Sequence, residues 1–211
     1  MAGGGEATRG VEVDDLGHRF AGSPFLWRHV SFAVRDGEIL ALCGRSGCGK
    51  STMLSIIAGW ENPTEGVVRR GEPCRISWVF QNPYGAAWRT VLDIAAYPLL
   101  AAGHTRSYAE EQARSILDSF GLSALENRLF QELSGGEAQR LMLVRAINAQ
   151  PNVLLVDEPT AQLDTRTADL VNSTLSQLAR SGAAVIIATH DPRTREACDR
   201  VIDLDLYARS E

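Results

Sequence analysis

The sequence predicts an α/β protein in which a helical subdomain is inserted into a core of strands and helices. Short continuous apolar runs, typical of buried parallel strands, occur both early and late in its 211 residues. Segments of helical composition separate these runs, and the middle of the chain has helical periodicity without a strand signal. We therefore predict one domain over residues 11–211, with the helical subdomain at about 82–148, after a flexible N-terminal tail at 1–10.

The first part of the predicted core contains strands of two kinds. Apolar and polar residues alternate over Val11–Phe20 and Val30–Val34, as expected for strands with one buried face. Ile39–Cys43 is instead a continuous apolar run, which indicates a strand buried on both faces. A glycine-rich loop follows, and Ser51–Ala58 has helical composition.

The helical subdomain is clearest at Ser107–Phe120, where apolar residues recur at helical spacing. Two residue pairs have the spacing of a capping box, in which side chains satisfy free backbone N–H groups at a helix start. These pairs are Ser107 with Glu110 and Ser123 with Glu126. After the subdomain the core resumes with three predicted strands and one helix, at Val153–Val156, Ala184–Ala188, Val201–Leu204 and Thr167–Arg180.

The composition limits the possible functions. Hydrophobic residues make up 45% of the chain and charged residues 22%, the balance of a soluble globular protein. The net charge of -5 argues against non-specific binding to nucleic acid. No apolar stretch approaches the roughly 18 residues of a membrane-spanning helix, and the N-terminus has no signal-peptide core. We expect a cytoplasmic protein.

The four cysteines show no C-x-x-C spacing, so neither a zinc site nor a disulfide framework is indicated. We interpret Cys43, Cys74 and Cys198 as core or near-core residues. Cys48 lies within the glycine-rich loop, where we expect a bulky alkyl group on its thiol to block ligand binding.

The segment Gly44–Ser51, GRSGCGKS, fits the P-loop pattern G-x-x-x-x-G-K-[ST] between a predicted strand and a predicted helix. Its glycines let backbone N–H groups face phosphates, and the helix N-terminus adds a favourable dipole. Lys50 supplies positive charge near the β- and γ-phosphates, and the Ser51 hydroxyl suits Mg²⁺. The alternative is a chance match in a glycine-rich turn. The predicted phosphate site consists of Gly44, Ser46, Gly47, Cys48, Gly49, Lys50, Ser51 and Thr52.

Two carboxylates follow the predicted strand Val153–Val156. The carboxyl ends of parallel strands are where ligands bind in open α/β sheets. Asp157 is placed to hold Mg²⁺, and Glu158 is placed to act as the general base on an attacking water. The alternative for this pair is a solvated strand end or a helix cap.

The segment Leu133–Arg140, LSGGEAQR, resembles the LSGGQ-type signature of ABC ATPases, with Glu137 at its last position. It is also a helix N-terminus in which Ser134 is the cap residue. Kinases, GTPases and AAA proteins with a P-loop do not carry this segment. The resemblance implies that Ser134, Gly135 and Gly136 face the γ-phosphate of an ATP held by another subunit.

The resemblance extends over nearly the whole chain. Gln81 looks like the Q-loop glutamine, a further ligand of Mg²⁺, and Ala161–Asp164 looks like the D-loop, with Asp164 near the nucleotide. His190 looks like the switch histidine, although a capped strand-end histidine is the alternative. Phe20 lies where the family places an aromatic ring that stacks on adenine, with a plain core aromatic as its alternative.

Membership of this family implies a P-loop NTPase fold with an antiparallel β edge beside the parallel core. It also implies ATP and Mg²⁺ as ligands, and a head-to-tail dimer, either a homodimer or a pair with another ATPase subunit. The further partners are transmembrane permease subunits, so the chain would lie peripherally at the cytoplasmic face of the membrane, and no nucleic acid is expected. Segment 82–89 fits the coupling surface, where Tyr84 and Trp88 are either exposed anchors or subdomain core.

Three other functions use the same motifs. The chain could regulate a membrane partner without transport, act as a soluble ABC ATPase in DNA repair or translation, or be an inactive binding subunit. The coiled coils and insertions typical of the second class are absent, and the catalytic residues are present, which argues against the third. Gly66–Gln81 and Trp88–Asp93 look like nitrate, sulfonate and taurine importers, whereas Leu133–Arg140 and Thr189–Pro192 look like lipoprotein-releasing and macrolide exporters. Substrate and direction therefore stay open.

Overall fold

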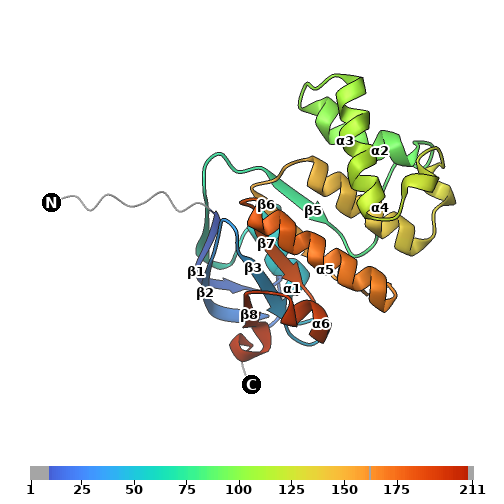
Figure 1. Cartoon of the computed structure of the whole chain (residues 1–211). Coiled ribbons are helices and arrows are strands. Elements are labelled where there is room, and N and C mark those ends of the chain that lie inside the picture. Colours follow the sequence, from blue (N-terminus) through green and yellow to red (C-terminus); the bar gives the residue numbers. More distant parts are fainter. Residues whose placement is uncertain (1–9, 162, 209–211) are drawn as a thin grey trace.

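The computed structural model describes residues 10–161 and 163–208, and it contains two sheets (Figure 1). The smaller sheet is antiparallel, in the strand order β2-β1-β4. Its strands are β1 Gly10–His18, β2 Trp27–Arg35 and β4 Glu65–Arg70. This sheet is the predicted antiparallel edge. Of the predicted tail, residues 1–9 lie outside the described residues, and Gly10 already belongs to β1.

The larger sheet is parallel, in the strand order β5-β6-β7-β3-β8. Every residue of its three central strands is buried, which explains why these strands are uninterrupted apolar runs in the sequence. Because the strands are parallel, their carboxyl ends meet at one edge of the sheet, where the candidate site lies. The strands are β3 Ile39–Cys43, β5 Ile76–Val79, β6 Val153–Asp157, β7 Ala184–Ala188 and β8 Arg200–Asp203.

Helices accompany the core and form the inserted subdomain. Figure 1 shows α2, α3 and α4 grouped at the upper right, away from the antiparallel sheet. The core helices are α1 Lys50–Ala58, α5 Thr165–Arg180 and α6 Pro192–Glu196. The subdomain helices are α2 Val91–Ala101, α3 Arg106–Ser119 and α4 Gly135–Asn148. Short 3-10 turns lie at η1 Ser123–Leu125, η2 Phe130–Glu132 and η3 Leu204–Tyr207.

The parallel sheet separates two apolar cores. Along β6, Leu154 and Val156 face the core shared with the helical subdomain and α5, whereas Val153 and Leu155 face the core shared with α1 and the antiparallel sheet. This alternation follows from the period of two in a strand. Full burial of each such side chain contributes roughly 1.5–3 kcal/mol, so both faces hold the sheet in place.

The two predicted capping boxes in the helical subdomain are wrong. The N-cap of α3 is Thr105, whose hydroxyl accepts a hydrogen bond from the Tyr108 amide at 3.4 Å. A better-placed cap two residues upstream of Ser107 therefore starts the helix. Ser123 instead donates to the Asp118 carboxylate at 2.8 Å and opens only a 3-10 turn.

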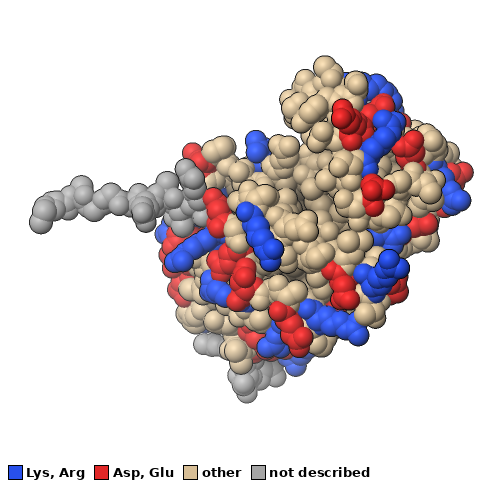
Figure 2. Space-filling view, viewed as in Figure 1, with Lys and Arg blue, Asp and Glu red and all other residues tan. Residues whose placement is uncertain are grey.

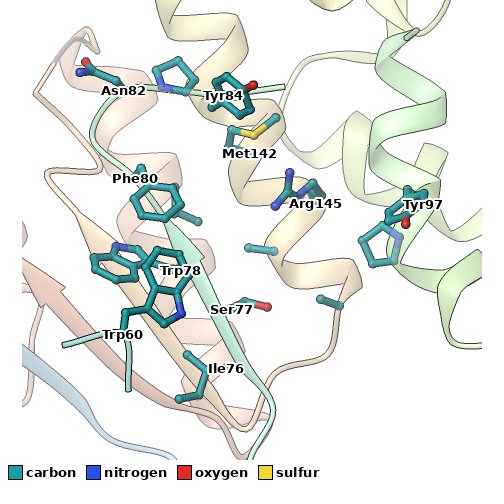
Figure 3. A pocket seen from close by; sticks show the side chains of 15 residues that line it. Trp60, Ile76, Ser77, Trp78, Phe80, Asn82, Tyr84, Tyr97, Met142 and Arg145 are labelled. Carbon is teal, nitrogen blue, oxygen red and sulfur yellow. The ribbon is translucent and has the colours of Figure 1, made fainter. Parts of the chain in front are cut away.

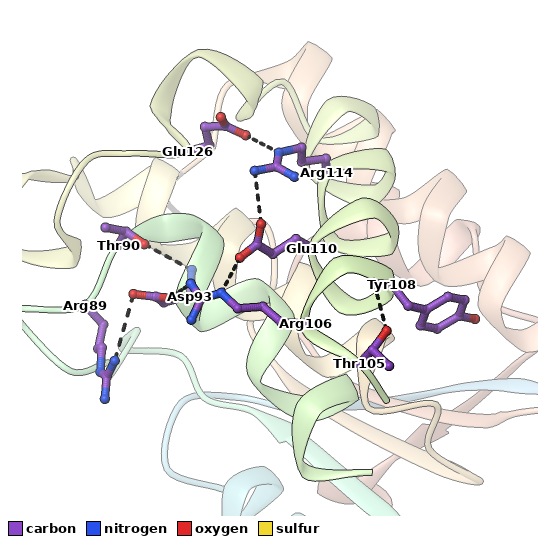
Figure 4. Close-up of polar contacts among 9 residues, drawn as sticks. All are labelled: Arg89, Thr90, Asp93, Thr105, Arg106, Tyr108, Glu110, Arg114 and Glu126. Atoms are coloured by element: carbon purple, nitrogen blue, oxygen red, sulfur yellow. Dashed lines mark hydrogen bonds and ion pairs between the residues drawn. The ribbon is translucent and has the colours of Figure 1, made fainter. Parts of the chain in front are cut away.

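The glutamates of those pairs belong to a chain of ion pairs on the subdomain surface (Figure 4). Glu110 accepts from the guanidinium groups of Arg106 at 2.6 Å and Arg114 at 3.4 Å, and Arg114 continues to Glu126 at 2.9 Å. Arg106 also reaches Asp93 at 3.3 Å. These exposed pairs tie α2, α3 and the η1 segment to one another, although each contributes little by itself.

Candidate nucleotide-binding site

The P-loop connects the end of β3 to the start of α1. Gly44, Gly47 and Gly49 all have positive φ angles, of 140°, 79° and 95°. A Cβ atom at Gly44 would lie 2.5 Å from the Cys48 Sγ, and one at Gly49 would lie 2.7 Å from the Trp27 Nε1. The loop therefore needs glycine at both positions, for conformation and for space.

The Lys50 ammonium is hydrogen-bonded to the backbone of this loop. The side chain is buried, and its Nζ donates to the carbonyl oxygens of Gly44 at 2.9 Å and Arg45 at 3.2 Å. Two of its three N–H donors are thus occupied, which fixes the ammonium and leaves one donor for a ligand.

Asp157 ends β6 beside the start of α1. The Ser51 hydroxyl donates to the Asp157 carboxylate at 2.6 Å. Burial raises the pKa of Asp157, whereas the hydrogen bond from Ser51 acts in the opposite direction and the neighbouring Glu158 adds to the rise. The described residues contain no group of three or more His, Cys, Asp or Glu side chains that could hold a metal ion. An ion at this point would draw its other ligands from hydroxyl, amide, phosphate or water oxygens.

Glu158 and His190 form a direct pair. The His190 Nδ1 lies 2.7 Å from the Glu158 Oε1, while the Thr189 hydroxyl and the His190 amide lie 3.4 Å from the other carboxylate oxygen. The Glu158 backbone has a left-handed φ of 48°, and its buried carboxylate contacts Thr189 and His190, the two residues that follow β7. The geometry places the predicted base beside the predicted switch residue.

One cleft of about 650 Å³ brings together most of the predicted site. Its lining includes the predicted residues Phe20, Gly44, Ser46, Gly47, Gly49, Lys50, Ser51, Thr52, Gln81, Asp157, Glu158 and His190. Phe20 is half exposed at the rim, which argues against the core alternative, and its ring meets His18 edge to face at 5.0 Å. Cys48 does not line the cleft, because its side chain is buried under the loop, and burial raises the pKa of its thiol.

The signature segment lies elsewhere, at the start of α4. Ser134 is the N-cap, and its hydroxyl and amide both donate to the Glu137 carboxylate at 2.8 Å. These two hydrogen bonds lower the pKa of Glu137. Neither Ser134 nor the following Gly135 and Gly136 lines the cleft of the same chain.

Asp164 also stays outside the cleft. It is the N-cap of α5, accepting from the Thr167 hydroxyl at 2.7 Å and the Thr167 amide at 3.0 Å, and these bonds lower the pKa of Asp164. Residue 162 of the predicted D-loop lies outside the described residues. Within one chain the structure therefore assembles the P-loop half of the predicted site and leaves the signature segment and Asp164 outside it.

A polar cluster around Asp191, the residue after His190, was not predicted. The Asp191 carboxylate accepts from the hydroxyls of Thr160 at 3.0 Å and Thr194 at 3.1 Å, and so connects the segment after Glu158 to α6. Asp191 followed by proline is a helix-start signal that could have indicated this role.

A second concave surface lies between the edge strand β5 and the helices α4 and α2 (Figure 3). The rings of Trp60, Trp78 and Phe80 lie against one another, with centroids 4.8–5.7 Å apart, at the wall of a groove of about 440 Å³. Tyr84 on its rim is 84% exposed and Trp88 is 74% exposed. Of the two alternatives for these aromatics, the structure excludes burial in the subdomain core.

Comparisons with known proteins agree with this geometry. The ABC transporter family model matches residues 27–161. The chain is 39% identical over 194 residues to a lipoprotein-releasing system ATP-binding protein of Chromohalobacter salexigens, covering 84% of this chain and 82% of that protein. It is 38% identical over 201 residues to an aliphatic sulfonates import ATP-binding protein of Rhizobium johnstonii, covering 94% and 78%.

Solved structures show the same fold. A dimeric bacterial ABC transporter cassette superimposes with a TM-score of 0.83 at 26% identity, covering 92% of this chain and 93% of that one. A putative metal-chelate type ABC transporter in an inward-facing conformation superimposes with a TM-score of 0.77 at 31% identity, covering 92% and 79%. The resemblance inferred from the signature segment is therefore confirmed, and the chain belongs to the ABC transporter family.

Proposed function

We propose that this chain is the ATP-binding and ATP-hydrolysing subunit of an ABC membrane transporter, driving solute transport through ATP-dependent head-to-tail dimerisation. The observation that carries the proposal is the single cleft that gathers the P-loop, Gln81, Asp157, Glu158 and His190. Relatives named as ATP-binding proteins of a lipoprotein-releasing system and of a sulfonate importer support the transporter reading, without favouring either direction.

The phosphates of ATP would bind along the P-loop. Backbone N–H groups and the N-terminus of α1 supply donors and a favourable dipole. Lys50, anchored to two carbonyls, directs its remaining donor at the phosphates. The half-exposed ring of Phe20 at the rim of the cleft provides a surface on which adenine can stack.

The donors in the cleft fit Mg²⁺. The Ser51 hydroxyl and the Asp157 carboxylate are already in contact at 2.6 Å, and Gln81 lines the same cleft. These are the hard oxygen ligands that Mg²⁺ prefers. When bound, the ion neutralises charge on the β- and γ-phosphates.

Hydrolysis would use Glu158 as the general base. Its carboxylate takes a proton from a water as the water oxygen attacks the γ-phosphorus, and the bond to the β-phosphate oxygen breaks with its electron pair leaving on ADP. His190, 2.7 Å from the Glu158 carboxylate, orients this base and is near enough to the cleft to contact the γ-phosphate.

A second ATPase subunit would complete the site. The N-terminus of α4 presents Ser134, Gly135 and Gly136 at a helix end suited to an anion, but away from the chain's own cleft. A head-to-tail partner would bring this end onto the γ-phosphate, with Asp164 at the same interface. Loss of the γ-phosphate on hydrolysis removes these contacts and loosens the dimer. One related cassette was solved as a dimer with ADP and Pi.

Coupling to the membrane would use the aromatic groove of Figure 3 and the exposed segment 82–89. Such a groove suits a short helix from a transmembrane permease subunit, with Tyr84 and Trp88 as anchors, at the cytoplasmic face of the membrane.

In the described part of the chain, no helix has both the length and the apolar character to cross a membrane. Figure 2 shows basic and acidic side chains interspersed over the visible face, which does not favour a nucleic-acid partner.

The proposal is tested by purifying the chain with its partners from native membranes and measuring Mg²⁺-dependent ATP hydrolysis. We expect co-purification of a multi-spanning membrane protein and hydrolysis of ATP to ADP and phosphate. A chain that hydrolyses ATP but is recovered without any membrane protein would contradict the transporter assignment.

A further inference from the structure

The last strand of the parallel sheet is bound to β3 by a carboxylate at each of its two ends. Before β8, the Asp199 carboxylate accepts a hydrogen bond from the Ile39 amide at 2.8 Å, where β3 begins. After β8, the Asp205 carboxylate accepts from the Arg45 amide at 2.8 Å, where β3 has passed into the P-loop. The two contacts are chemically alike, but only the second touches the predicted phosphate site.

Asp205 is held firmly in place by its own turn. The Asp203 carboxylate accepts from the Asp205 amide at 3.0 Å and so caps η3. Leu204 is fully buried in the core that lies under the P-loop, and η3 packs against β2 and β3. The backbone at Asp205 is therefore held by this cap and by the buried Leu204, while its side chain is 36% exposed.

The peptide unit that Asp205 binds is one of the two whose carbonyls anchor Lys50, and it makes the shorter of the two hydrogen bonds. The amide N–H of Arg45 and the carbonyl of Gly44 belong to one planar peptide group. Its N–H donates to the Asp205 carboxylate at 2.8 Å, and its carbonyl accepts from the Lys50 Nζ at 2.9 Å. A single rigid unit thus lies between an anion and a cation, and each hydrogen bond polarises the group in the direction that strengthens the other.

Asp205 also closes the space behind the loop. A Cβ atom at Gly44 would lie 3.5 Å from the Asp205 carboxyl group, and the Asp205 Oδ1 is buried without a hydrogen-bond partner among the described residues. The Arg45 guanidinium lies 3.6 Å from this oxygen, at ion-pair distance. Both oxygens of the Asp205 carboxylate therefore lie against Arg45 of the P-loop, one accepting from its amide and the other beside its guanidinium.

We propose that Asp205 is a positioning residue of the nucleotide site: it holds the Gly44–Arg45 peptide so that the Gly44 carbonyl fixes the Lys50 ammonium toward the phosphates. The inference rests on the proposed function, because it assigns Lys50 to phosphate binding. It makes the C-terminal turn η3, which no P-loop motif includes, a determinant of nucleotide affinity.

The test is equilibrium binding of fluorescent ADP and ATP to the purified chain in Mg²⁺, with the thermal midpoint of unfolding measured without nucleotide. We expect Asp205→Ala to raise both Kd values about tenfold, because the freed Gly44–Arg45 peptide no longer fixes the shorter of the two Lys50 anchors. Asp205→Asn keeps an oxygen that can accept from the Arg45 amide, so its Kd should stay within about threefold of the wild type. Asp199→Ala is the matched control: it removes the same kind of contact at the other end of β3 and should lower the midpoint without changing Kd.

Three results would overturn the inference. These are an unchanged Kd in Asp205→Ala, an equal rise in Asp199→Ala, or a rise in Asp205→Asn as large as in Asp205→Ala. If Asp205→Ala does not fold, Asp205→Ser, whose hydroxyl is too short to reach the Arg45 amide, replaces it under the same criteria. Failure of the wild-type chain to bind either nucleotide would instead contradict the proposed function itself.

Discussion

The core and the helical subdomain prepare their parts of the candidate site in different ways. At the carboxyl edge of the parallel sheet, side chains from distant segments are already in contact, as Ser51 is with Asp157 and Glu158 is with His190. At the start of α4, the side-chain hydrogen bonds of Ser134 that the described residues contain go to Glu137, three residues away in the same segment. One region is a preassembled cleft and the other is a capped helix end outside that cleft, which is the division that the proposed head-to-tail dimer requires.

The largest effect is expected from a variant that removes the proposed general base from the cleft. Replacing Glu158 with Gln keeps the size of the side chain and removes the base, so ATP hydrolysis should fall by about 100- to 10,000-fold. ATP binding should persist, and size-exclusion chromatography should show a dimer that is stable with ATP and absent without it. Turnover near the wild-type rate in this variant would remove Glu158 from the role of base.

The division between the two regions can be tested by mixing two inactive variants. Lys50→Ala weakens nucleotide binding in the cleft, whereas Gly135→Asp places a negative charge where the partner's γ-phosphate is expected. Aspartate suits the first turn of a helix, so the second variant should fold. In a head-to-tail pair one composite site keeps both an intact cleft and an intact signature, and the mixture should recover a measurable part of the wild-type ATPase rate. Recovery should fail if each chain contains a complete site by itself, and self-mixtures of each variant serve as controls.

A moderate effect is expected on the alkylation rate of Cys48, which reports how closely the core packs against the P-loop. Its thiol is buried, and burial raises its pKa, so thiolate is scarce at neutral pH. We expect N-ethylmaleimide to modify Cys48 in the folded chain at least about tenfold more slowly than in the unfolded chain. Peptide mass spectrometry at timed intervals measures both rates. Once attached, the group should block nucleotide binding, and full ATP binding by confirmed Cys48-modified protein would contradict the loop geometry.

The smallest expected effect lies at the signature end. Glu137→Ala removes the capping box and should lower the free energy of unfolding by about 1 kcal/mol at neutral pH. Hydrogen bonds from Ser134 lower the pKa of Glu137 in the folded state. The stabilisation is therefore present above the pKa of the unfolded state, about 4.3, and is lost as the pH falls through the lower folded value. Urea denaturation of both proteins at several pH values should show the difference shrinking in acid, and a constant difference would assign it to packing.

Local patterns in the sequence were sufficient where local physics decides the structure. The strands Ile39–Cys43 and Ala184–Ala188 were predicted to the residue, because uninterrupted apolar runs between turns have few other solutions. The strands β4 and β5 were not predicted, because β4 is largely exposed and β5 is a four-residue edge strand. The start of α3 was misplaced because two cap residues compete within three positions.

The site divides in the same manner. The P-loop, Asp157 and Glu158 lie in short motifs beside predicted strands, so their positions at the sheet edge could be predicted from the ends of those strands. Gln81 and Phe20 were predicted from the family resemblance instead. Asp205 could not, because its contact with Arg45 joins residues 160 positions apart and depends on how η3 packs. The exposure of Tyr84 and Trp88 was also undecided in the sequence, since aromatic residues suit both a core and an interface.

The left-handed backbone of Glu158 has a consequence for how this protein can change over generations. Few residues other than glycine adopt such a conformation, and holding one there costs roughly 1–3 kcal/mol. Substitution by glycine at this position would relieve the backbone but remove the proposed general base, so backbone relaxation and the proposed hydrolysis are opposed at this one residue. A related chain without the proposed hydrolytic role could therefore accept glycine at this position while its P-loop and signature segments stay unchanged.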